Sequence, residues 1–318
     1  MTGGELLMAS ALDALVGDPR WVPHPVRLIG RCIASVDRRV RALCRTAMSL
    51  RIAGVCLACG LPIVTYAIGA LLIEEADRLA GWLGSVLSVG LASMTLAGRD
   101  LWDHVRAVDG PLQAGDLPAA RRAVAMIVGR DTGALSDSEV ARATVETVAE
   151  SAADGVIAPL FYLAIGGAPL ALAYKAINTL DSMIGHKDER YSDFGWASAR
   201  LDDLANWIPA RAAAVLLLLG AGLGTGQVEH VRQGWRVFRR DGGKHPSPNS
   251  GRPEAAMAGI LGVRLGGTNF YGGVAQERPV LCAEGRPVQP GDIASAAKIM
   301  AAASVLGVCF AAGFRWLV

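Results

Sequence analysis

The sequence has few charged residues and few aromatic ones for its length. Of its 318 residues, 19% are Asp, Glu, Lys or Arg and 6% are aromatic, whereas 52% are hydrophobic. The mean hydropathy is +0.35. Because soluble domains carry about 25% charged residues and disordered chains few apolar ones, the composition excludes both an ordinary soluble fold and a disordered chain. The sequence predicts an integral membrane protein.

The sequence also lacks an excess of one charge, a recognisable cysteine motif and a Walker loop. The 31 Lys and Arg nearly balance the 29 Asp and Glu, for a net charge of +2, so we expect no nucleic-acid partner. The six cysteines, at positions 32, 44, 56, 59, 282 and 309, fit neither a disulfide framework nor a paired zinc site. No GxxxxGK[ST] motif occurs, so any nucleotide would be bound without a Walker loop.

Long apolar runs are what the sequence does have. Residues 52–73 and 79–98 predict a transmembrane helical hairpin, because a helix of about 20 apolar residues crosses the hydrocarbon of a bilayer. Three less regular runs follow, at 156–174, 208–226 and 293–314. We expect an all-α, polytopic membrane protein with four to five membrane-embedded helical elements, including a broken or hairpin helix pair around a polar site, in a single domain of residues 1–318.

The arginines indicate an orientation in the membrane. The N-terminus carries Glu5 and no positive region, so it predicts no signal peptide. Eight arginines precede the first apolar run, and Lys and Arg are enriched on the cytoplasmic side. We expect a multi-pass protein of the cell membrane with its N-terminus and active site on the cytoplasmic side. The nine Lys and Arg of residues 227–292 disfavour a crossing at 208–226, and the side of that segment stays open.

A polar stripe leads into the third apolar run. Ser136 and Glu139 form a capping box that starts a helix. Along this helix a basic and three acidic side chains recur every four residues and so share a face: Arg142, Glu146, Glu150 and Asp154. Spacing alone also fits the solvated face of an amphipathic helix. Because carboxylates are costly beside a membrane-length run and there usually pair or bind a metal, we predict that the three acidic residues are metal ligands.

A second stripe follows the same apolar run, and a turn signal lies between the two. The stripe consists of Lys175, Asn178, Asp181 or Ser182, Gly185 and His186. Residues 166–169 read Gly-Gly-Ala-Pro, which favours a chain reversal. A reversal would set Asp154 near Asp181 in one carboxylate-lined site, whereas a straight span would separate the stripes by about 30 Å. We favour the reversal.

Two loops complete the polar candidates. Asp202 and Asp203 resemble a fragment of the aspartate pairs that bind magnesium diphosphates, although a surface pair is the commoner explanation. The segment KHPSPNSG, at 244–251, is rigid and rich in hydrogen-bond donors, so Ser247 and Asn249 could bind an anion. A plain connecting loop has the same spacing.

Five segments in this order resemble the CobD/CbiB family of cobalamin biosynthesis membrane proteins. They are GDPRWVPHPVRLIGR from Gly17, GRDT from Gly129, ETVAESAADGVIAPLFY from Glu146, AYKAINTLDSMIGHKDERYSDFGWASARLDD from Ala173 and HPSPNSGRPEAAMAGILGVRLGG from His245. The resemblance runs from about residue 10 to the C-terminus. It implies an adenosylcobinamide-phosphate synthase, which joins (R)-1-amino-2-propanol or its O-phosphate to the free propionate of adenosylcobyric acid with ATP and magnesium.

The chemistry of amide formation from a carboxylate suggests a role for each of the polar residues. ATP would activate the propionate, with Mg²⁺ on the stripe carboxylates and Asp181 screening its phosphates. Lys175 is the predicted oxyanion clamp, and His186 the base that deprotonates the ammonium. The predicted substrate-binding residues are Arg130, Asp131, Asn178, Lys187, Arg190, Ser247 and Asn249. We expect Mg²⁺ and ATP but no tightly bound organic cofactor, with the corrinoid, the amine and membrane lipid as partners.

Two other classes of protein fit part of the pattern. Broken helices with acidic residues at membrane depth also occur in transporters and ion-coupled carriers. A phosphotransferase or prenyltransferase could use Asp202 and Asp203 as metal ligands. Neither alternative needs ATP, so ATP-dependent turnover distinguishes the ligase from both.

Overall fold

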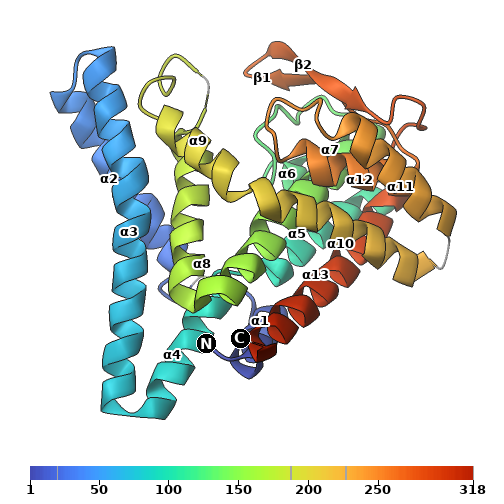
Figure 1. The fold of residues 1–318 in the computed structure, drawn as a ribbon. Helices are drawn as coiled ribbons and strands as arrows, with labels where there is room; N and C mark the ends of the chain where they lie inside the picture. The colour runs from blue at the N-terminus through green and yellow to red at the C-terminus, as the bar shows by residue number, and fades with distance from the viewer. Residues whose placement is uncertain (20, 187, 226–227, 318) are drawn as a thin grey trace. The chain divides into compact units, whose positions relative to one another are not determined.

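A computed structural model describes residues 1–19, 21–186, 188–225 and 228–317. The chain divides into two compact units, each built from separate stretches of sequence. Unit 1 comprises Met1–Ala97, Ala158–Asn206 and Val308–Val318, and unit 2 comprises Gly98–Ile157 and Trp207–Gly307. Figure 1 shows that both are helical, which confirms the predicted fold class, and that one β-hairpin interrupts the helices.

The helices of unit 1 are α1 (Gly3–Val16), α2 (Pro25–Leu43), α3 (Ala47–Leu79), α4 (Gly81–Ser93), α8 (Ala158–Ile184) and α9 (Trp196–Ala205). Those of unit 2 are α5 (Gly98–Gln113), α6 (Leu117–Val124), α7 (Asp137–Ser151), the π-helix η1 (Ala152–Ile157), α10 (Trp207–Thr225), α11 (Val228–Asp241) and α12 (Gly251–Leu261). Unit 2 also contains β1 (Leu265–Tyr271) and β2 (Val274–Leu281). Helix α13 (Gly291–Leu317) begins in unit 2 and ends in unit 1.

Four helical stretches of the described residues are long and apolar enough to cross a membrane. They are Ala47–Leu79, Gly81–Gln113, Asp137–Ile184 and Gly291–Leu317. A fifth crossing results if α9 and α10, which are bent by 47° at their break, count as one broken span. The prediction of four to five membrane elements is therefore confirmed.

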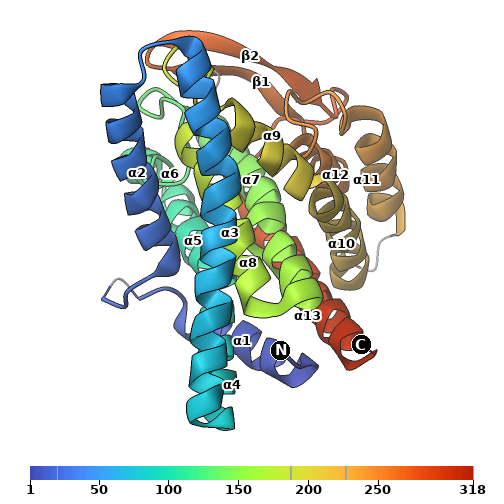
Figure 2. The same ribbon diagram turned by 60° about the vertical axis from the view of Figure 1, so that its left-hand side comes forward.

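Helix α3 shows how one helix meets both lipid and protein. Its exposed face carries large apolar side chains such as Ile63 and Leu71, which suit lipid. Its buried face carries the small residues Gly54, Ala58, Pro62, Gly69 and Ala76. A Cβ on Gly54 would lie 2.0 Å from the carbonyl oxygen of Phe194, so only glycine permits this close approach. Figure 2 shows α2 running alongside α3.

Helix α8 is a hairpin rather than a straight span. Gly167 has φ 68° and ψ −164°, which breaks the helix, and Pro169 follows it. The rings of Tyr162 and Tyr174, on opposite sides of this break, stack with centroids 4.9 Å apart and planes at 16°. Residues on the two arms can stack in this way only if the arms run antiparallel, as Figure 1 shows. The reversal predicted from residues 166–169 is confirmed.

The helix that carries the first stripe changes character before its last member. The capping box is present, because the Ser136 side chain accepts from the Glu139 amide and the Glu139 carboxylate accepts from Ser136. Helix α7 ends at Ser151, and Asp154 lies in the π-helix η1. The wider π turn breaks the four-residue register. The prediction that Asp154 continues the same α-helical stripe is therefore wrong.

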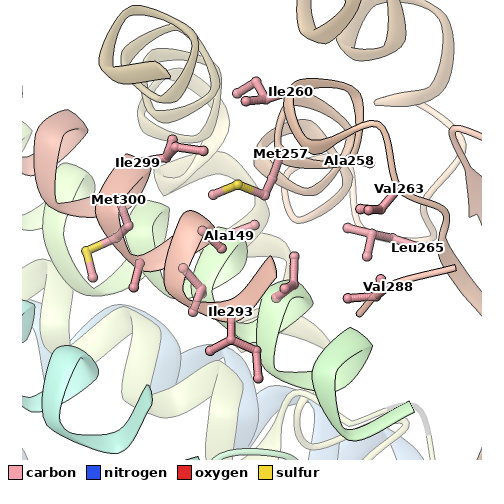
Figure 3. Close-up of a cluster of buried hydrophobic side chains, with 14 of the residues drawn as sticks. Ala149, Met257, Ala258, Ile260, Val263, Leu265, Val288, Ile293, Ile299 and Met300 are labelled. Atoms are coloured by element: carbon pink, nitrogen blue, oxygen red, sulfur yellow. The ribbon is translucent and has the colours of Figure 1, made fainter. Parts of the chain in front are cut away.

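One hydrophobic core fills unit 2 and joins distant parts of its sequence. Ala149 of α7, Met257 of α12 and Ile293 of α13 are fully buried in it, as the close-up in Figure 3 shows. Leu217 of α10 is also buried there. The core fixes α7 and α12, which carry the polar residues described below.

Candidate functional site

Unit 1 gathers an acidic cluster from the α8 hairpin and α9. Asp202 accepts hydrogen bonds from the side-chain amides of Asn178, at 3.5 Å, and Asn206, at 3.0 Å. The negative charges of Asp181 and Asp203 both act on Asp202. The second stripe and the pair Asp202 and Asp203, predicted separately, thus contribute to one cluster, whose carboxylate oxygens suit a hard cation or an ammonium group.

Two tyrosines of α8 hold α9 in place beside this cluster. The Tyr174 hydroxyl donates to the Asn206 side chain at 2.9 Å, and the Tyr162 hydroxyl donates to the Ala205 carbonyl at 2.8 Å. Tyr174 is fully buried and stacked on Tyr162. Lys175, the predicted clamp, is partly buried next to Tyr174. The hairpin therefore positions both sides of the acidic cluster.

The residues after α8 do not continue its polar face. The helix ends at Ile184, so His186 lies beyond it and is exposed, with its ring centroid 6.3 Å from that of Tyr191. The prediction that His186 shares one helical face with Lys175 is wrong, because the helix has already ended. Arg190 forms an ion pair with the buried Asp37 at 3.1 Å. Lys187 lies outside the described residues.

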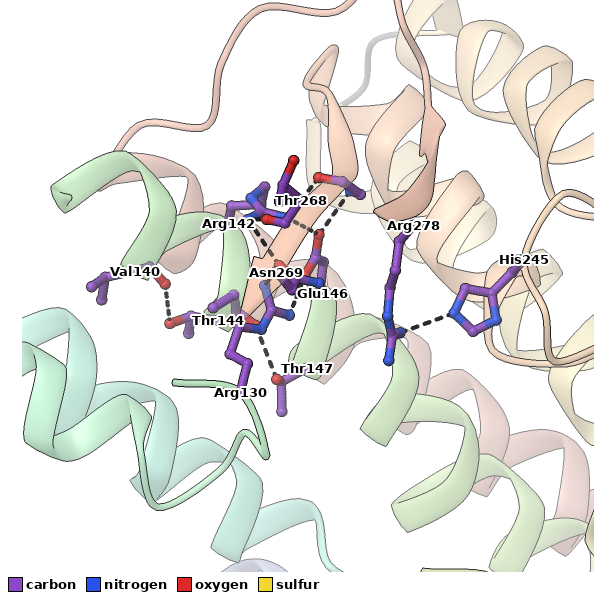
Figure 4. Close-up of polar contacts among 12 residues, drawn as sticks. Arg130, Val140, Arg142, Thr144, Glu146, Thr147, His245, Thr268, Asn269 and Arg278 are labelled. Carbon is purple, nitrogen blue, oxygen red and sulfur yellow. Dashed lines mark hydrogen bonds and ion pairs between the residues drawn. The ribbon is translucent and has the colours of Figure 1, made fainter. Parts of the chain in front are cut away.

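In unit 2 the first stripe meets the β-hairpin in a network in which the charged groups pair with each other. Glu146 is 6% exposed and forms ion pairs with Arg130 and Arg142. It also accepts the Gly266 amide at 2.8 Å. Both arginines donate to the side-chain oxygen of Asn269, at 2.8 and 3.0 Å. Figure 4 shows these side chains converging from α7, β1 and the loop before α7, an arrangement named the closed network below.

The closed network and Asp131 dock the hairpin onto unit 2. The Asp131 carboxylate accepts the amides of Gly272, at 3.1 Å, and Gly273, at 2.7 Å. Both glycines have positive φ, as a tight two-residue turn requires. In this structure Arg130 and Asp131 hold protein groups, and their predicted contact with substrate stays a prediction. A metal ion could bind Glu146 only by displacing two guanidinium groups.

A second polar group of unit 2 centres on Arg278 of β2, which sequence reasoning missed. Its Nη1 lies 3.0 Å from Nε2 of His245, and its Nη2 donates to the Tyr271 hydroxyl at 3.2 Å. Figure 4 shows Arg278 and His245 pointing toward each other. We call Arg278, His245 and Tyr271 the open cluster. The sequence does contain a sign of this hairpin, because a Gly-Gly pair such as Gly272-Gly273 between apolar and aromatic residues is typical of a β-hairpin turn.

The loop before α12 sets the direction of His245. The Ser247 amide donates to Nδ1 of His245 at 3.0 Å, and the Ser247 hydroxyl accepts the amides of Asn249 and Ser250. A Cβ on Gly251 would lie 2.5 Å from that of His245, so the loop packs tightly on the helix start. Ser247 thus shapes the loop, and Asn249 is buried within it. Anion binding by these two residues stays a prediction.

Two glutamates lie near the open cluster. Burial, and then the charges of Glu150 and Glu146, raise the pKa of Glu254 well above its usual range. Burial and the positive charge of Arg278 lower the pKa of His245, against smaller opposing effects of Glu150 and Glu146. In both side chains these shifts favour the neutral form.

The described residues contain no group of three or more His, Cys, Asp or Glu side chains placed to hold a metal ion. Metal binding by Glu146, Glu150, Asp154, Asp202 and Asp203 stays a prediction. Mg²⁺ commonly binds protein through one or two carboxylates and keeps substrate phosphates and water as its other ligands. Asp181 and Asp202 are two carboxylates of one cluster, and the charge of Asp181 acts on Asp202.

Comparison with known proteins gives one consistent family. The family model described as CobD/Cbib protein matches residues 6–300. The cobalamin biosynthesis protein CobD of Geobacter metallireducens is 49% identical over 290 residues, which cover 91% of this chain and 88% of that protein. CobD of Klebsiella pneumoniae is 45% identical over 98% of this chain and 97% of its own, and CbiB of Salmonella typhi is 43% identical over 95% and 93%. No solved structure matches the chain significantly.

Proposed function

Because this chain belongs to the CobD/CbiB family and is a membrane protein of cobalamin biosynthesis, we propose that it is the ligase that forms the aminopropanol amide. The proposed reaction joins (R)-1-amino-2-propanol, or its O-phosphate, to the free propionate of adenosylcobyric acid at the expense of ATP. The product is adenosylcobinamide or its phosphate.

The observation that supports this proposal is that the segments typical of the family bring their charged side chains together in clusters. Residues from the segments at Gly129, Glu146 and His245 meet in unit 2, in the closed network and the loop that orients His245. Residues from the segment at Ala173 form the acidic cluster of unit 1. Amide ligation needs groups for oxyanions and groups for cations, and the segments that carry the family resemblance contain both kinds.

The chemistry begins with activation of the propionate, whose hydroxide is too poor a leaving group for an amine to displace. ATP transfers a phosphoryl or adenylyl group to one carboxylate oxygen and releases ADP or diphosphate, and the amine nitrogen then attacks the carbonyl carbon. The C–O bond to that group breaks as the C–N bond forms. An amine attacks only after it has lost its ammonium proton, so a base is required. His186 stays our candidate for the base, because its imidazole is exposed just beyond the arm of α8 that carries Lys175.

We propose that the acidic cluster binds the cation that accompanies the substrate ATP. Asp181 and Asp202 would bind the Mg²⁺ that arrives with ATP, which neutralises phosphate charge during transfer. Asn178 and Asn206 orient the Asp202 carboxylate through their amides. Lys175, on the same arm of α8, would contact an oxyanion of the activated substrate.

The test is an assay of the purified protein in detergent with adenosylcobyric acid, MgATP and either amine, read by mass spectrometry of the amide product. We expect product only with ATP, and a loss of about 100-fold or more in kcat for Asp202→Asn. Glu189→Gln is the matched control, because Glu189 is exposed and lies in the loop after α8. Absence of product from folded, corrin-binding protein would refute the ligase and favour a carrier or an accessory subunit.

A further inference from the structure

In the contact between His245 and Arg278, two hydrogen-bond donors face each other without an acceptor between them. A backbone N–H can only donate, so the Ser247 amide, 3.0 Å from Nδ1 of His245, occupies the lone pair of that nitrogen. The proton of the neutral ring is therefore on Nε2. This Nε2–H faces Nη1 of Arg278 at 3.0 Å, and a guanidinium nitrogen never accepts. An acceptor shared by both groups would resolve the conflict.

Tyr271 adds a third donor at the same place. Its oxygen already accepts from Nη2 of Arg278 at 3.2 Å, which leaves the phenolic hydrogen to be donated outward. Asn269 and Tyr271 alternate with Thr268 and Phe270 along β1, and Arg278 pairs with Gly267, so these side chains share one face of the hairpin.

The charge of Arg278 is not neutralised by an ion pair in the described part of the chain, unlike that of Arg130 or Arg142. Glu150 and Glu254 act on it only through space. Burial and the charges of Glu150 and Glu146 raise the pKa of Glu254 well above its usual range, which favours its uncharged form. A partly buried cation with this surplus of donors attracts an anion.

We infer that Arg278, His245 and Tyr271 bind a phosphate group of a substrate. One phosphate oxygen would accept from both Nη1 of Arg278 and Nε2 of His245, and a second would accept from the Tyr271 hydroxyl. The inference rests on the proposed function for the identity of the substrate, which is either ATP or aminopropanol O-phosphate. A phosphate suits these donors better than a propionate, because it carries more negative charge and its third terminal oxygen stays available for a further contact.

The surroundings keep this site in place before a ligand binds. Asp131 holds the turn of the hairpin, and Arg130 holds β1 through Asn269. The Ser247 amide and the packing at Gly251 fix the imidazole of His245. Asp131, Arg130 and Ser247 are thus positioning residues, whereas the open cluster touches the ligand.

Steady-state kinetics of Arg278→Gln in the full-length protein test the inference and identify the source of the phosphate. We expect the KM of one phosphate-bearing substrate to rise about 10- to 100-fold, since charge-assisted hydrogen bonds are lost. If the site holds ATP, the KM of MgATP rises with either amine. If it holds the amine's phosphate, the KM of aminopropanol O-phosphate rises and that of free aminopropanol does not.

Milder variants guard against a folding defect. Tyr271→Phe removes only the phenolic O–H and should raise the same KM about 3- to 10-fold, and Arg278→Lys should fall between the wild type and Arg278→Gln. Arg264→Gln is the matched control, because Arg264 is an exposed arginine at the start of the same hairpin segment. Unchanged KM values for both phosphate-bearing substrates, or a rise for adenosylcobyric acid alone, would overturn the inference.

Direct binding separates this inference from the ligase assignment. Calorimetric titration of MgATP, and separately of aminopropanol O-phosphate, onto wild type and Arg278→Gln needs no turnover. Weaker binding of one of them to the variant supports the site even if the wild type forms no amide. Equal affinities of wild type and variant for both ligands, in protein that does form the amide, leave the ligase standing and refute the phosphate site.

Discussion

Unit 2 holds two arginine-containing clusters on the same hairpin, and they differ in whether their donors have acceptors. In the closed network, Arg130 and Arg142 donate to Glu146, Asn269 and backbone carbonyls. In the open cluster, Arg278 meets an imidazole N–H and a phenol. A buried charge with all its partners stabilises one arrangement of the chain, whereas a charge without them is available to a ligand. The comparison assigns the first cluster to docking the hairpin and the second to binding.

The largest expected effect comes from opening the closed network. Glu146→Gln leaves two largely buried guanidinium groups without their carboxylate, which should lower the free energy of unfolding by about 3–5 kcal/mol. Thermal unfolding of the protein in detergent, followed by circular dichroism, measures the change. Glu229→Gln, at an exposed carboxylate of α11, is the control. If both variants unfold at the wild-type temperature, Glu146 does not dock the hairpin, and its predicted role as a metal ligand gains support.

A smaller loss of stability is expected when Asp131, which binds the turn of the hairpin, is replaced. Asp131→Ala leaves the amides of Gly272 and Gly273 without their acceptor, at a cost of about 1–3 kcal/mol. Hydrogen exchange should show faster exchange in residues 265–281 than in α12. Equal protection of the hairpin in variant and wild type would contradict the docking role of Asp131.

The pH dependence of stability probes the open cluster. Because the pKa of His245 is lowered in the folded protein, the unfolded chain binds more protons below about 6.5, and stability should fall as the pH falls from there toward the lowered pKa. The charged groups that act on this ring are Arg278, Glu150 and Glu146. His245→Gln should lack this loss of stability below pH 6.5.

A phosphate ligand should change the same pH profile. A bound anion favours the imidazolium and raises the pKa of His245, so saturating aminopropanol O-phosphate or MgATP should reduce the acid loss of stability in wild type. Urea unfolding at a series of pH values, with and without ligand, gives the comparison. A profile that is the same in His245→Gln and wild type would show that the ring does not titrate in this range.

The smallest effect on stability is expected for Arg278 itself. Removal of a guanidinium that has no ion pair should change the free energy of unfolding by less than about 1 kcal/mol in Arg278→Gln, although the KM of a phosphate-bearing substrate rises. The same unfolding experiment used for Glu146→Gln measures it. A loss as large as that of Glu146→Gln would erase the distinction between the two clusters.

The parts of the fold that depend on local sequence were predictable. Ser136 and Glu139 form the capping box that starts α7, and the chain reverses at Gly167 because positive φ is open to glycine. The long apolar runs give the membrane elements. The family resemblance, carried by continuous segments, is also confirmed.

The polar site was only partly predictable. Asp181 and Asn178 do cluster with Asp202, but His186 lies past the end of α8 and Asp154 lies in a π-helix. A four-residue spacing cannot reveal where a helix ends or widens. Arg278 was missed because its partners lie 7 and 33 residues away along the chain.

The sequence by itself determined the membrane class, the helical elements, the reversal in α8 and the family, because each depends on neighbouring residues or on continuous motifs. Only the tertiary structure decided which charges are neutralised. Glu146 bonds to Arg130 and to the Gly266 amide, which lie 16 and 120 residues away along the chain. Arg278 forms no ion pair with a carboxylate in the described residues. Electrostatic and hydrogen-bond energies depend on distance in space, so a group's role as structural partner or ligand contact is settled only when the chain has folded.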